Sequence, residues 1–227
     1  MQCVILAAGE GTRMRPLTET IPKPLLRVCG KPILEHIIEA LPSSVDELII
    51  VTGYKGEMIR EYIGAEFLGK KVQYLTQENP KAGTADALMC AEGVAKGKFL
   101  VMYADDIHGK EALAKVVETS SGMLTARSAT PEKFGVLVLR PDGTLEAIIE
   151  KPTNPPSNCV NIGGFVVTED IFKFHAELSA SGEYYLTDSI TEYAQHCPVT
   201  VVEQPLWLPI GYPEHIAEAE AVMCPKN

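Results

Sequence analysis

Short apolar runs alternate with amphipathic stretches over the first 130 residues of the chain. An uninterrupted apolar run is typical of a strand buried in a parallel sheet. Such runs predict strands over 3–8, 48–51, 72–75, 99–103 and 122–127. Helical periodicity predicts helices that start at Pro32 and extend over 55–67, 84–94 and 110–120. Because strands that alternate with helices form right-handed βαβ units, we expect a mostly parallel sheet.

The pattern changes after residue 130. Apolar runs at 136–139 and 145–149 flank Pro-Asp-Gly-Thr at 141–144, a turn sequence that predicts an antiparallel ribbon. The remaining pattern predicts strands over 160–167 and 199–202, and helices near 169–179, over 187–196 and from Pro213. No repeat or linker-like composition divides the chain. We therefore expect one α/β domain over 1–227, with a Rossmann-like, mixed, mostly parallel sheet and an antiparallel elaboration.

Composition narrows the class of protein. The 227 residues are 46% apolar and 22% charged, which is ordinary for a globular protein. A net charge of −10 disfavours a nucleic-acid partner, because duplex binding depends on phosphate neutralisation by Lys and Arg. No apolar run approaches the ~20 residues of a membrane span, and the N-terminal run lacks a basic leader, so a cytoplasmic protein without a membrane partner is expected. The six cysteines form no C-x-x-C pair, which predicts reduced thiols.

One segment of this acidic chain is basic. Residues 1–31 carry five basic and two acidic side chains, whereas the rest of the chain has a net charge of −13. Within this segment, Gly9 and Gly11 follow the first predicted strand and precede Arg13. Glycines let backbone N–H groups approach a phosphate, and arginine adds a forked cation. The segment matches neither a dinucleotide fingerprint nor a P-loop, and a plain tight turn is the alternative.

The longer stretch LAAGEGTRMRPLTETIPKPLL at 6–26 closely resembles the signature of the sugar-1-phosphate nucleotidylyltransferases. The resemblance extends from residue 2 to about residue 216. It implies condensation of a nucleoside triphosphate with a sugar 1-phosphate to give a nucleotide sugar and pyrophosphate. It also implies a nucleotide-binding half over 1–130 and a sugar-phosphate-binding half over 131–227. The chain stops where many relatives continue into a left-handed β-helix, so we expect no acetyltransferase activity, and a homo-oligomer is left open.

The resemblance implies a set of nucleotide contacts. They are Leu6, Ala8, Gly9, Gly11, Thr12, Gln77, Gly83 and Thr84. Gln77 and the Gly-Thr-Ala sequence at 83–85 look like the loop that reads the base. From Gln77 to Gly83 this loop spans six positions, where the family usually has five. The extra residue favours the alternative that Gln77 is an ordinary loop amide.

On the sugar-phosphate side, the resemblance implies contacts from Gly135, Glu150, Lys151 and Asn161. The sequence GEYYLTD at 182–188 resembles the family's entry to a helix near the sugar. A lone lysine next to an attacking phosphate is chemically reasonable, because its ammonium is a compact charge opposite a dianion. A solvated turn lysine is the alternative for Lys151.

The catalytic residues implied by the resemblance are Arg13, Lys23 and Asp105. A carboxylate at the carboxyl end of a parallel strand suits Mg²⁺, which we expect as the cofactor. The family's W-x-D-x-G motif reads WLPIG at 207–211, so Pro209 stands where the aspartate would supply the second metal ligand. Asp106 is a competing second ligand, and its alternative role is a helix N-cap.

UTP or dTTP with glucose 1-phosphate are the substrates that this pattern favours, because the base loop resembles loops that read pyrimidines. The alternatives are GTP with mannose 1-phosphate, and CTP with phosphocholine. Because Pro209 removes an expected metal ligand, a non-catalytic protein that binds nucleotide sugars is an alternative of a different class.

Overall fold

The strand β1 (Gln2–Ala7) lies at the centre of the fold. In the computed structural model, which describes residues 1–225, this strand is buried on both faces beyond its first residue. It pairs in parallel with β4 (Glu47–Thr52) on one side and with β7 (Lys98–Tyr103) on the other. A strand buried on both faces and hydrogen-bonded along both edges needs apolar side chains throughout, which is what the sequence provides.

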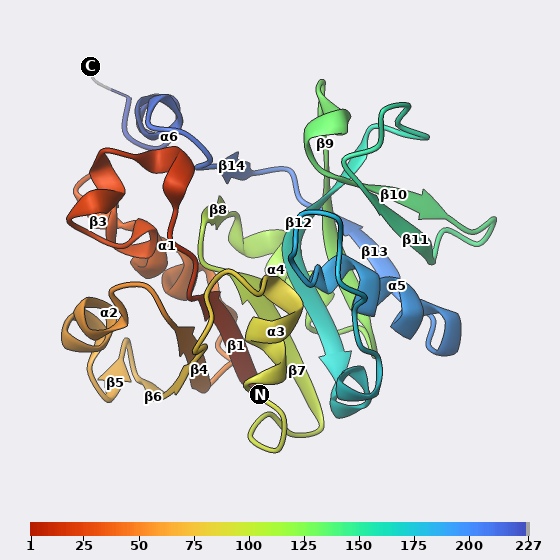
Figure 1. Ribbon diagram of the computed structural model, residues 1–227, viewed down its shortest axis with the longest axis horizontal. Coiled ribbons are helices and arrows are strands. Elements are labelled where there is room, and N and C mark those ends of the chain that lie inside the picture. Colours follow the sequence, from red (N-terminus) through yellow and green to blue (C-terminus); the bar gives the residue numbers. More distant parts are fainter. Residues whose placement is uncertain (226–227) are drawn as a thin grey trace.

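One ten-stranded sheet extends from this centre (Figure 1). Its path is β11-β10-β12-β7-β1-β4-β6-β5, and β9 and β13 extend from β12. The bounds of the strands not yet given are β5 Glu66–Phe67, β6 Lys70–Thr76, β9 Gly122–Arg127, β10 Gly135–Leu139, β11 Leu145–Glu150, β12 Cys159–Thr168 and β13 Thr200–Glu203. Strands β1, β4, β6 and β7 are parallel, β10, β11 and β12 add antiparallel pairs, and β13 pairs in parallel with β9. The expected mixed sheet with a parallel core and an antiparallel elaboration is confirmed.

Helices cover both faces of the sheet. Alternate residues of β1 point to opposite faces, so Ile5 belongs to one apolar cluster and Val4 to another. The cluster with Ile5 includes α1 (Ile33–Ala40), α2 (Gly56–Ile63) and α4 (Lys110–Val116). The cluster with Val4 includes α3 (Thr84–Met89) and α5 (Leu186–His196), which lie in front of the sheet in Figure 1.

Four of the predicted helices are wrong in their extent. The helices expected over 84–94 and 110–120 end early, at Met89 and Val116. The helix expected over 55–67 ends at Ile63, because Gly64 has a φ of 73° and the chain turns back. Residues 66–67 instead form β5, which pairs with β6 through a tight turn in which Leu68 and Gly69 have positive φ. The helix expected near 169–179 is only a 3₁₀ segment over 169–173, after which Phe174 packs against α5.

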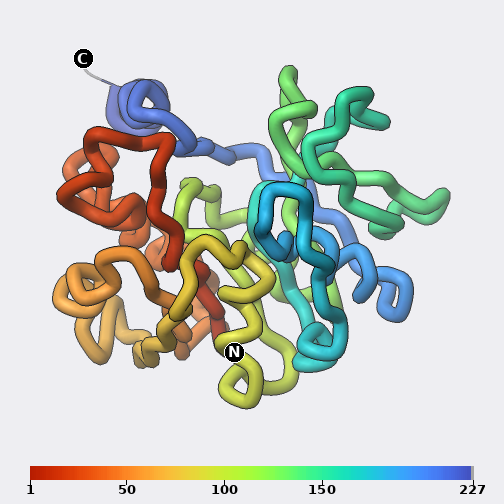
Figure 2. The backbone as a smooth tube through the Cα atoms, viewed as in Figure 1, coloured from red at the N-terminus to blue at the C-terminus, as the bar shows by residue number. Residues whose placement is uncertain are grey.

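The C-terminal segment returns to the start of the chain. Short strand β14 (Trp207–Pro209) pairs with β8 (Asp106–His108), and α6 (Glu214–Met223) then lies beside the N-terminal segment (Figure 2). A disulfide joins Cys29 to Cys224, across a sequence separation of 195 residues. The expectation that all six cysteines are reduced thiols is therefore wrong for these two. The spacing of the cysteines along the sequence does not predict this pair.

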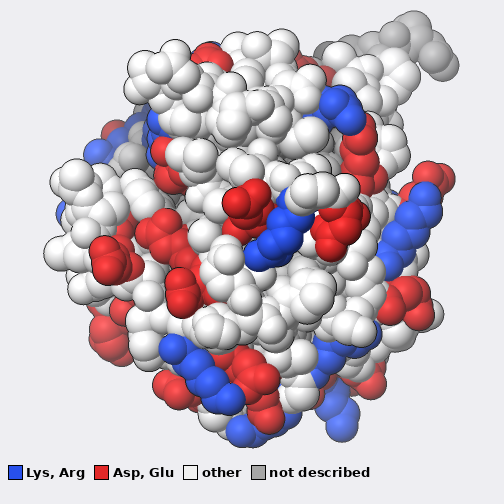
Figure 3. Space-filling model, turned by 90° about the vertical axis from the view of Figure 1, so that its right-hand side faces the viewer, with Lys and Arg blue, Asp and Glu red and all other residues white. Residues whose placement is uncertain are grey.

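Charged groups are mixed on the surface. Figure 3 shows Lys and Arg interspersed with Asp and Glu on the side of the molecule at the right of Figure 1. Within residues 1–225 there is no helix that is long and apolar enough to cross a membrane.

The disulfide gives a first prediction. Cys29→Ser should lower the free energy of unfolding by about 2–5 kcal/mol, because the crosslink closes a long loop in the unfolded chain. Denaturant titration of the oxidised protein measures this effect, with Cys90→Ser as a control because Cys90 is a free cysteine. Thiol titration of the unfolded, unreduced protein should find four thiols; six would show that Cys29 and Cys224 are not bonded.

Candidate active site

One cleft of about 1520 Å³ lies along the carboxyl ends of the central strands. Every residue that the sequence analysis placed in a site lines this cleft: Leu6, Ala8, Gly9, Gly11, Thr12, Arg13, Lys23, Gln77, Gly83, Thr84, Asp105, Gly135, Glu150, Lys151, Asn161 and Pro209. An open α/β sheet places its ligand crevice at this edge. The volume exceeds the roughly 300–1,000 Å³ of an ordinary small-molecule site, so the cleft has room for more than one small molecule.

The glycine-rich loop leaves β1 and turns at Gly11. This glycine has a φ of 61°, and the Thr18 hydroxyl donates a hydrogen bond of 2.8 Å to its carbonyl oxygen. A Cβ at Gly11 would lie 3.0 Å from the Cβ of Lys23, so the absence of a side chain lets these two segments meet. Arg13 follows on the exposed side of the loop, 5.6 Å from the centre of the Tyr212 ring.

Lys23 and Asp105 form an ion pair within the cleft. Lys23 Nζ donates to Asp105 Oδ2 at 2.9 Å, and the lysine side chain is only 9% exposed. Burial opposes ionisation of Asp105, but the Lys23 and Arg13 charges hold its pKa below the ordinary value of an aspartate. A buried ammonium without a counter-ion is costly, and Asp105 supplies that counter-ion to Lys23.

Asp106 has a separate position from its neighbour. It begins β8 rather than capping a helix, which corrects the N-cap alternative. Its Oδ2 accepts a hydrogen bond of 2.8 Å from Trp207 Nε1, and its Oδ1 accepts one of 3.1 Å from Ile210 N. Burial and the charge of Asp105 raise the pKa of Asp106 to about 7. Asp106 therefore holds the C-terminal strand in place, and Pro209 lies opposite it in the β8–β14 pair.

The donor set at this point fits a hard divalent cation with few protein ligands. Asp105 uses one carboxylate oxygen for Lys23 and is 40% exposed, so the other oxygen is available toward the cleft. No cluster of three or more His, Cys, Asp or Glu suited to a metal occurs among residues 1–225. Mg²⁺ retains several waters and binds through one or two carboxylates plus substrate oxygens, which is compatible with this arrangement.

The base side of the cleft begins where β6 ends. Gln77 is 3% exposed, and Nε2 of its amide donates to Gly83 O and to Asp86 Oδ2. Gly83 has a φ of 99°, and a Cβ there would lie 2.5 Å from Tyr184 O. Tyr184 N in turn donates to Ala82 O at 2.7 Å. The base loop is thus bound to a segment from the other half of the chain.

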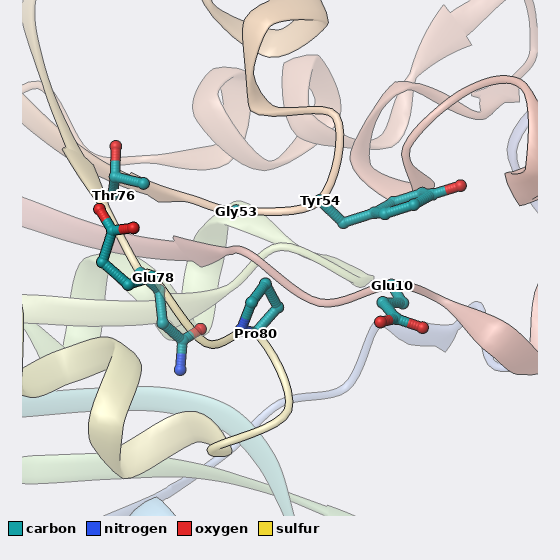
Figure 4. Close-up of a pocket in the computed structure, with 7 residues that line it drawn as sticks. Glu10, Gly53, Tyr54, Thr76, Glu78 and Pro80 are labelled. Atoms are coloured by element: carbon teal, nitrogen blue, oxygen red, sulfur yellow. The ribbon is translucent and has the colours of Figure 1, made fainter.

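A smaller cavity of about 220 Å³ lies beside the base loop (Figure 4). Thr76 and Glu78 lie toward one end of it, and Tyr54 and Glu10 toward the other. A Cβ on Gly53 would be 2.8 Å from Ala8 O and 2.9 Å from Pro80 Cγ. The missing side chain therefore allows two loops to approach each other: the glycine-rich loop after β1, which is the expected phosphate loop, and the expected base loop.

The residues expected to contact the sugar phosphate lie where β10, β11 and β12 meet. Gly135 is directly opposite Glu150 in the β10–β11 pair, and a Cβ at Gly135 would lie 3.0 Å from Glu150 Oε2. Burial raises the pKa of Glu150, and the charge of Lys151 offsets part of that increase. Lys151 Nζ is 3.6 Å from Glu150 Oε1 and the lysine has a φ of 43°, an uncommon backbone conformation for a residue other than glycine. Asn161 Oδ1 accepts a hydrogen bond from Gly163 N at 3.0 Å.

Several residues along the cleft were not identified from the sequence as site residues. Tyr185 and Tyr212 line it, and the Thr187 hydroxyl is buried there with no hydrogen-bond partner among residues 1–225. Tyr185 and Thr187 belong to the GEYYLTD stretch, so that motif was the available signal. His108 is buried beside β14 and both ring nitrogens lack a partner. Burial lowers its pKa to about 4, so its ring is neutral at neutral pH.

Comparisons with known proteins identify the class. Residues 2–224 match the nucleotidyl transferase family, and the chain belongs to that family. This confirms the resemblance found in the sequence. The chain is 33% identical over 224 residues to the bifunctional protein GlmU of Methanococcus maripaludis, covering 96% of this chain and 53% of that protein. It therefore spans about half the length of the GlmU proteins that it matches.

Other relatives are covered almost completely. The UTP–glucose-1-phosphate uridylyltransferase AglF of Haloferax volcanii is 36% identical over 234 residues, which cover 97% of this chain and 95% of that protein. A solved putative glucose-1-phosphate thymidylyltransferase from Bacillus anthracis has a TM-score of 0.85 at 25% identity, covering 100% of this chain and 96% of that one. A UDP-glucose pyrophosphorylase structure also has a TM-score of 0.85, at 23% identity and 97% coverage of both chains, and shows the shared fold.

The packing at Gly163 gives a second prediction. A Cβ at this glycine would lie 2.2 Å from Cδ2 of Tyr103, and its φ is 77°. Gly163→Ala should therefore lower the free energy of unfolding by about 1–3 kcal/mol from overpacking, in addition to the cost of a positive φ. Gly143→Ala isolates the second cost, because Gly143 has a φ of 82° and nothing within 4 Å of its Cβ position. Equal losses in denaturant titrations of the two variants would contradict the predicted steric conflict.

Proposed function

We propose that this protein transfers a nucleotidyl group from UTP or dTTP to a sugar 1-phosphate, with glucose 1-phosphate favoured, and releases pyrophosphate. The order of strands carries this proposal. Asp105 follows β7, which lies between β1, β4 and β6 on one side and β12, β10 and β11 on the other. The phosphate and base loops follow the first group, whereas Glu150, Lys151 and Asn161 lie on or directly after the second. Two substrates bound on these two sides would meet at Asp105.

The proposed reaction requires that the two substrates are positioned for attack and that the negative charge on the phosphate oxygens is neutralised. An in-line attack of the sugar phosphate on the α-phosphorus builds charge on the nonbridging and leaving oxygens, and no covalent intermediate is required. Arg13 and Lys23 are cations on the triphosphate side. Lys151 is 56% exposed and lies on the sugar side, where it would hold the attacking phosphate. Mg²⁺ held by Asp105 would supply a divalent charge to the phosphate oxygens.

The relatives support this class of reaction. The named uridylyltransferase and the putative thymidylyltransferase are both covered almost completely by this chain. Pro209 is the observation that favours a second candidate, a protein that binds nucleotide sugars without turning them over. A cytoplasmic location and a homo-oligomeric state remain predictions.

A substrate panel tests the proposed function. Pyrophosphate release should be measured with UTP, dTTP, GTP, CTP and ATP, each with glucose 1-phosphate, mannose 1-phosphate and phosphocholine. Release is expected with UTP or dTTP and glucose 1-phosphate, and Arg13→Ala should reduce it by about 10²–10³-fold as a control for contamination. Nucleotide-sugar binding without release in any combination would favour the non-catalytic candidate.

Lys151 gives a third prediction. Lys151→Ala should raise the KM for the sugar phosphate and leave the KM for the nucleotide nearly unchanged, because an ammonium opposite a dianion is lost. Steady-state kinetics with each substrate varied in turn measure the effect. Lys96→Ala is the matched control, since Lys96 is exposed and lies outside the cleft. An unchanged kcat/KM for the sugar phosphate would contradict the assignment of Lys151 to the sugar-phosphate site.

Pro209 gives a fourth prediction. Proline offers only its carbonyl to a cation, so the metal site should depend on Asp105 and substrate oxygens, and activity should need high free Mg²⁺. Pro209→Asp should lower the Mg²⁺ concentration that gives half-maximal pyrophosphate release. The same Mg²⁺ titration with Asp106→Asn tests the alternative. If Asp106→Asn raises the half-maximal Mg²⁺ concentration and Pro209→Asp does not lower it, Asp106 is the second ligand. Full activity of Asp105→Asn would overturn the metal assignment.

A further inference from the structure

The amide of Gln77 is held in one orientation by two groups that can only accept hydrogen bonds. Nε2 donates to the Gly83 carbonyl oxygen at 3.0 Å and to Asp86 Oδ2 at 2.8 Å. A carbonyl and a carboxylate have no hydrogen to give, so the side of the Gln77 amide that faces them must be the NH₂ group. Both of its hydrogens are used by these two contacts.

The carbonyl oxygen of the same amide therefore remains for a ligand. Among the hydrogen bonds of residues 1–225, none involves Gln77 Oε1, and Oε1 is absent from the buried polar atoms that lack a partner. Gln77 lines the large cleft together with Gly83 and Thr84, and it also lines the smaller cavity beside the base loop. A fixed acceptor at this point can pair with a ligand only through a donor.

Asp86 is the stronger of the two holding groups. It lies in the first turn of α3, and a hydrogen bond to a carboxylate is roughly twice as strong as one to a neutral acceptor. The helix start is itself fixed, because Ala85 N donates to Tyr184 O at 2.9 Å. The carboxylate of Asp86 thus faces Gln77 from a rigid position.

We propose that Asp86 is a positioning residue that sets base selectivity, by fixing Gln77 so that its carbonyl oxygen faces the nucleobase. This inference rests on the proposed function, since it takes the base to lie against Gln77.

Uracil and thymine carry an N3–H donor between two carbonyl groups, whereas N3 of cytosine is an acceptor. An acceptor facing an acceptor leaves both groups unpaired, which costs about 10- to 100-fold in affinity. Uridine and thymidine nucleotides should therefore bind better than cytidine nucleotides. Guanine also carries an imino N–H, so this contact discriminates against CTP rather than against GTP.

The experiment compares binding of UTP and CTP by calorimetry in the absence of sugar phosphate. The wild-type protein should bind UTP about 10- to 100-fold more tightly than CTP. Asp86→Leu removes the anionic acceptor, and Asp86→Lys replaces it with a donor that favours the opposite orientation of the amide. The ratio of the two affinities should fall by at least about 10-fold in Asp86→Lys and by a smaller factor in Asp86→Leu. Asp86→Asn should keep most of the ratio, because its carbonyl oxygen can still accept from Gln77.

Two controls separate this role from a structural one. If Asp86 only stabilised the helix, its variants would weaken UTP and CTP binding equally and leave the ratio unchanged. Because Asp86 acts through the Gln77 amide, Asp86→Leu should have no further effect on the ratio in a Gln77→Ala background. Glu92→Gln is a matched control on a nearby exposed acid. If the Asp86→Leu protein does not fold, Asp86→Lys and Gln77→Ala still test the ratio.

The outcomes distinguish the two proposals. Equal affinities of the wild-type protein for UTP and CTP, or a ratio in Asp86→Lys within about twofold of the wild-type ratio, would overturn the role of Asp86. Selective binding of UTP without pyrophosphate release in the substrate panel would overturn the proposed function and leave the base selectivity standing.

Discussion

The parallel pairing of β1 with both β4 and β7 is the constraint on which the rest of the molecule depends. The buried parts of these strands are apolar except for Thr52 at the end of β4, which suits strands that pair side by side in the interior of a sheet. Parallel pairing then brings their carboxyl ends to one edge. The glycine-rich loop and Lys23 follow β1, and Asp105 follows β7. The parallel pairing of β1 with β7 therefore brings Lys23 within hydrogen-bond distance of Asp105.

Two adjacent aspartates are used in different ways because their surroundings differ. Asp105 is paired with a buried ammonium and is partly exposed to the cleft, and its pKa is lowered. Asp106 forms no ion pair among residues 1–225 and accepts hydrogen bonds from Trp207 and Ile210, and its pKa is raised to about 7. Neighbouring carboxylates cannot both ionise at low cost when buried, and the structure relieves this by giving one a charge partner and the other neutral donors. Asp105 is therefore suited to act on charged ligands, and Asp106 to hold the C-terminal strand.

Much of the fold could be predicted from the sequence because its signals are local. The buried strands are apolar throughout, and the turn at 141–144 contains the residues that such turns require. The parts that could not be predicted depend on distant partners. Strand β8 is three residues long and exists because β14 pairs with it from a hundred positions away. The segment after Lys173 leaves the helical path because Phe174 packs against Tyr193 and His196, and the disulfide of Cys29 depends on where α6 lies.

The same distinction applies to the site. Its residue types were evident from motifs, and the structure brings them together in one cleft. The sequence could not show which atoms those residues present, since the orientation of the Gln77 amide depends on Asp86 and its burial on the surrounding loop. It also could not show that Lys23 would be nearly buried, because a lysine is usually exposed unless a partner compensates its charge.

The two halves of the cleft are connected at Gly83. Tyr184 N donates to Ala82 O, Ala85 N donates to Tyr184 O, and Leu186 N donates to Thr84 Oγ1. These three hydrogen bonds join the base loop to the segment that leads into α5, which packs against β11 on the sugar side. Gly83 makes the contact close enough, since any Cβ would collide with the Tyr184 backbone. A shift of either segment by more than a hydrogen-bond length would break all three, so the base loop and the sugar-side segment must move together. The spacing between the two sides of the cleft is thereby constrained by these hydrogen bonds, which is the condition that the proposed in-line transfer between two bound phosphates requires.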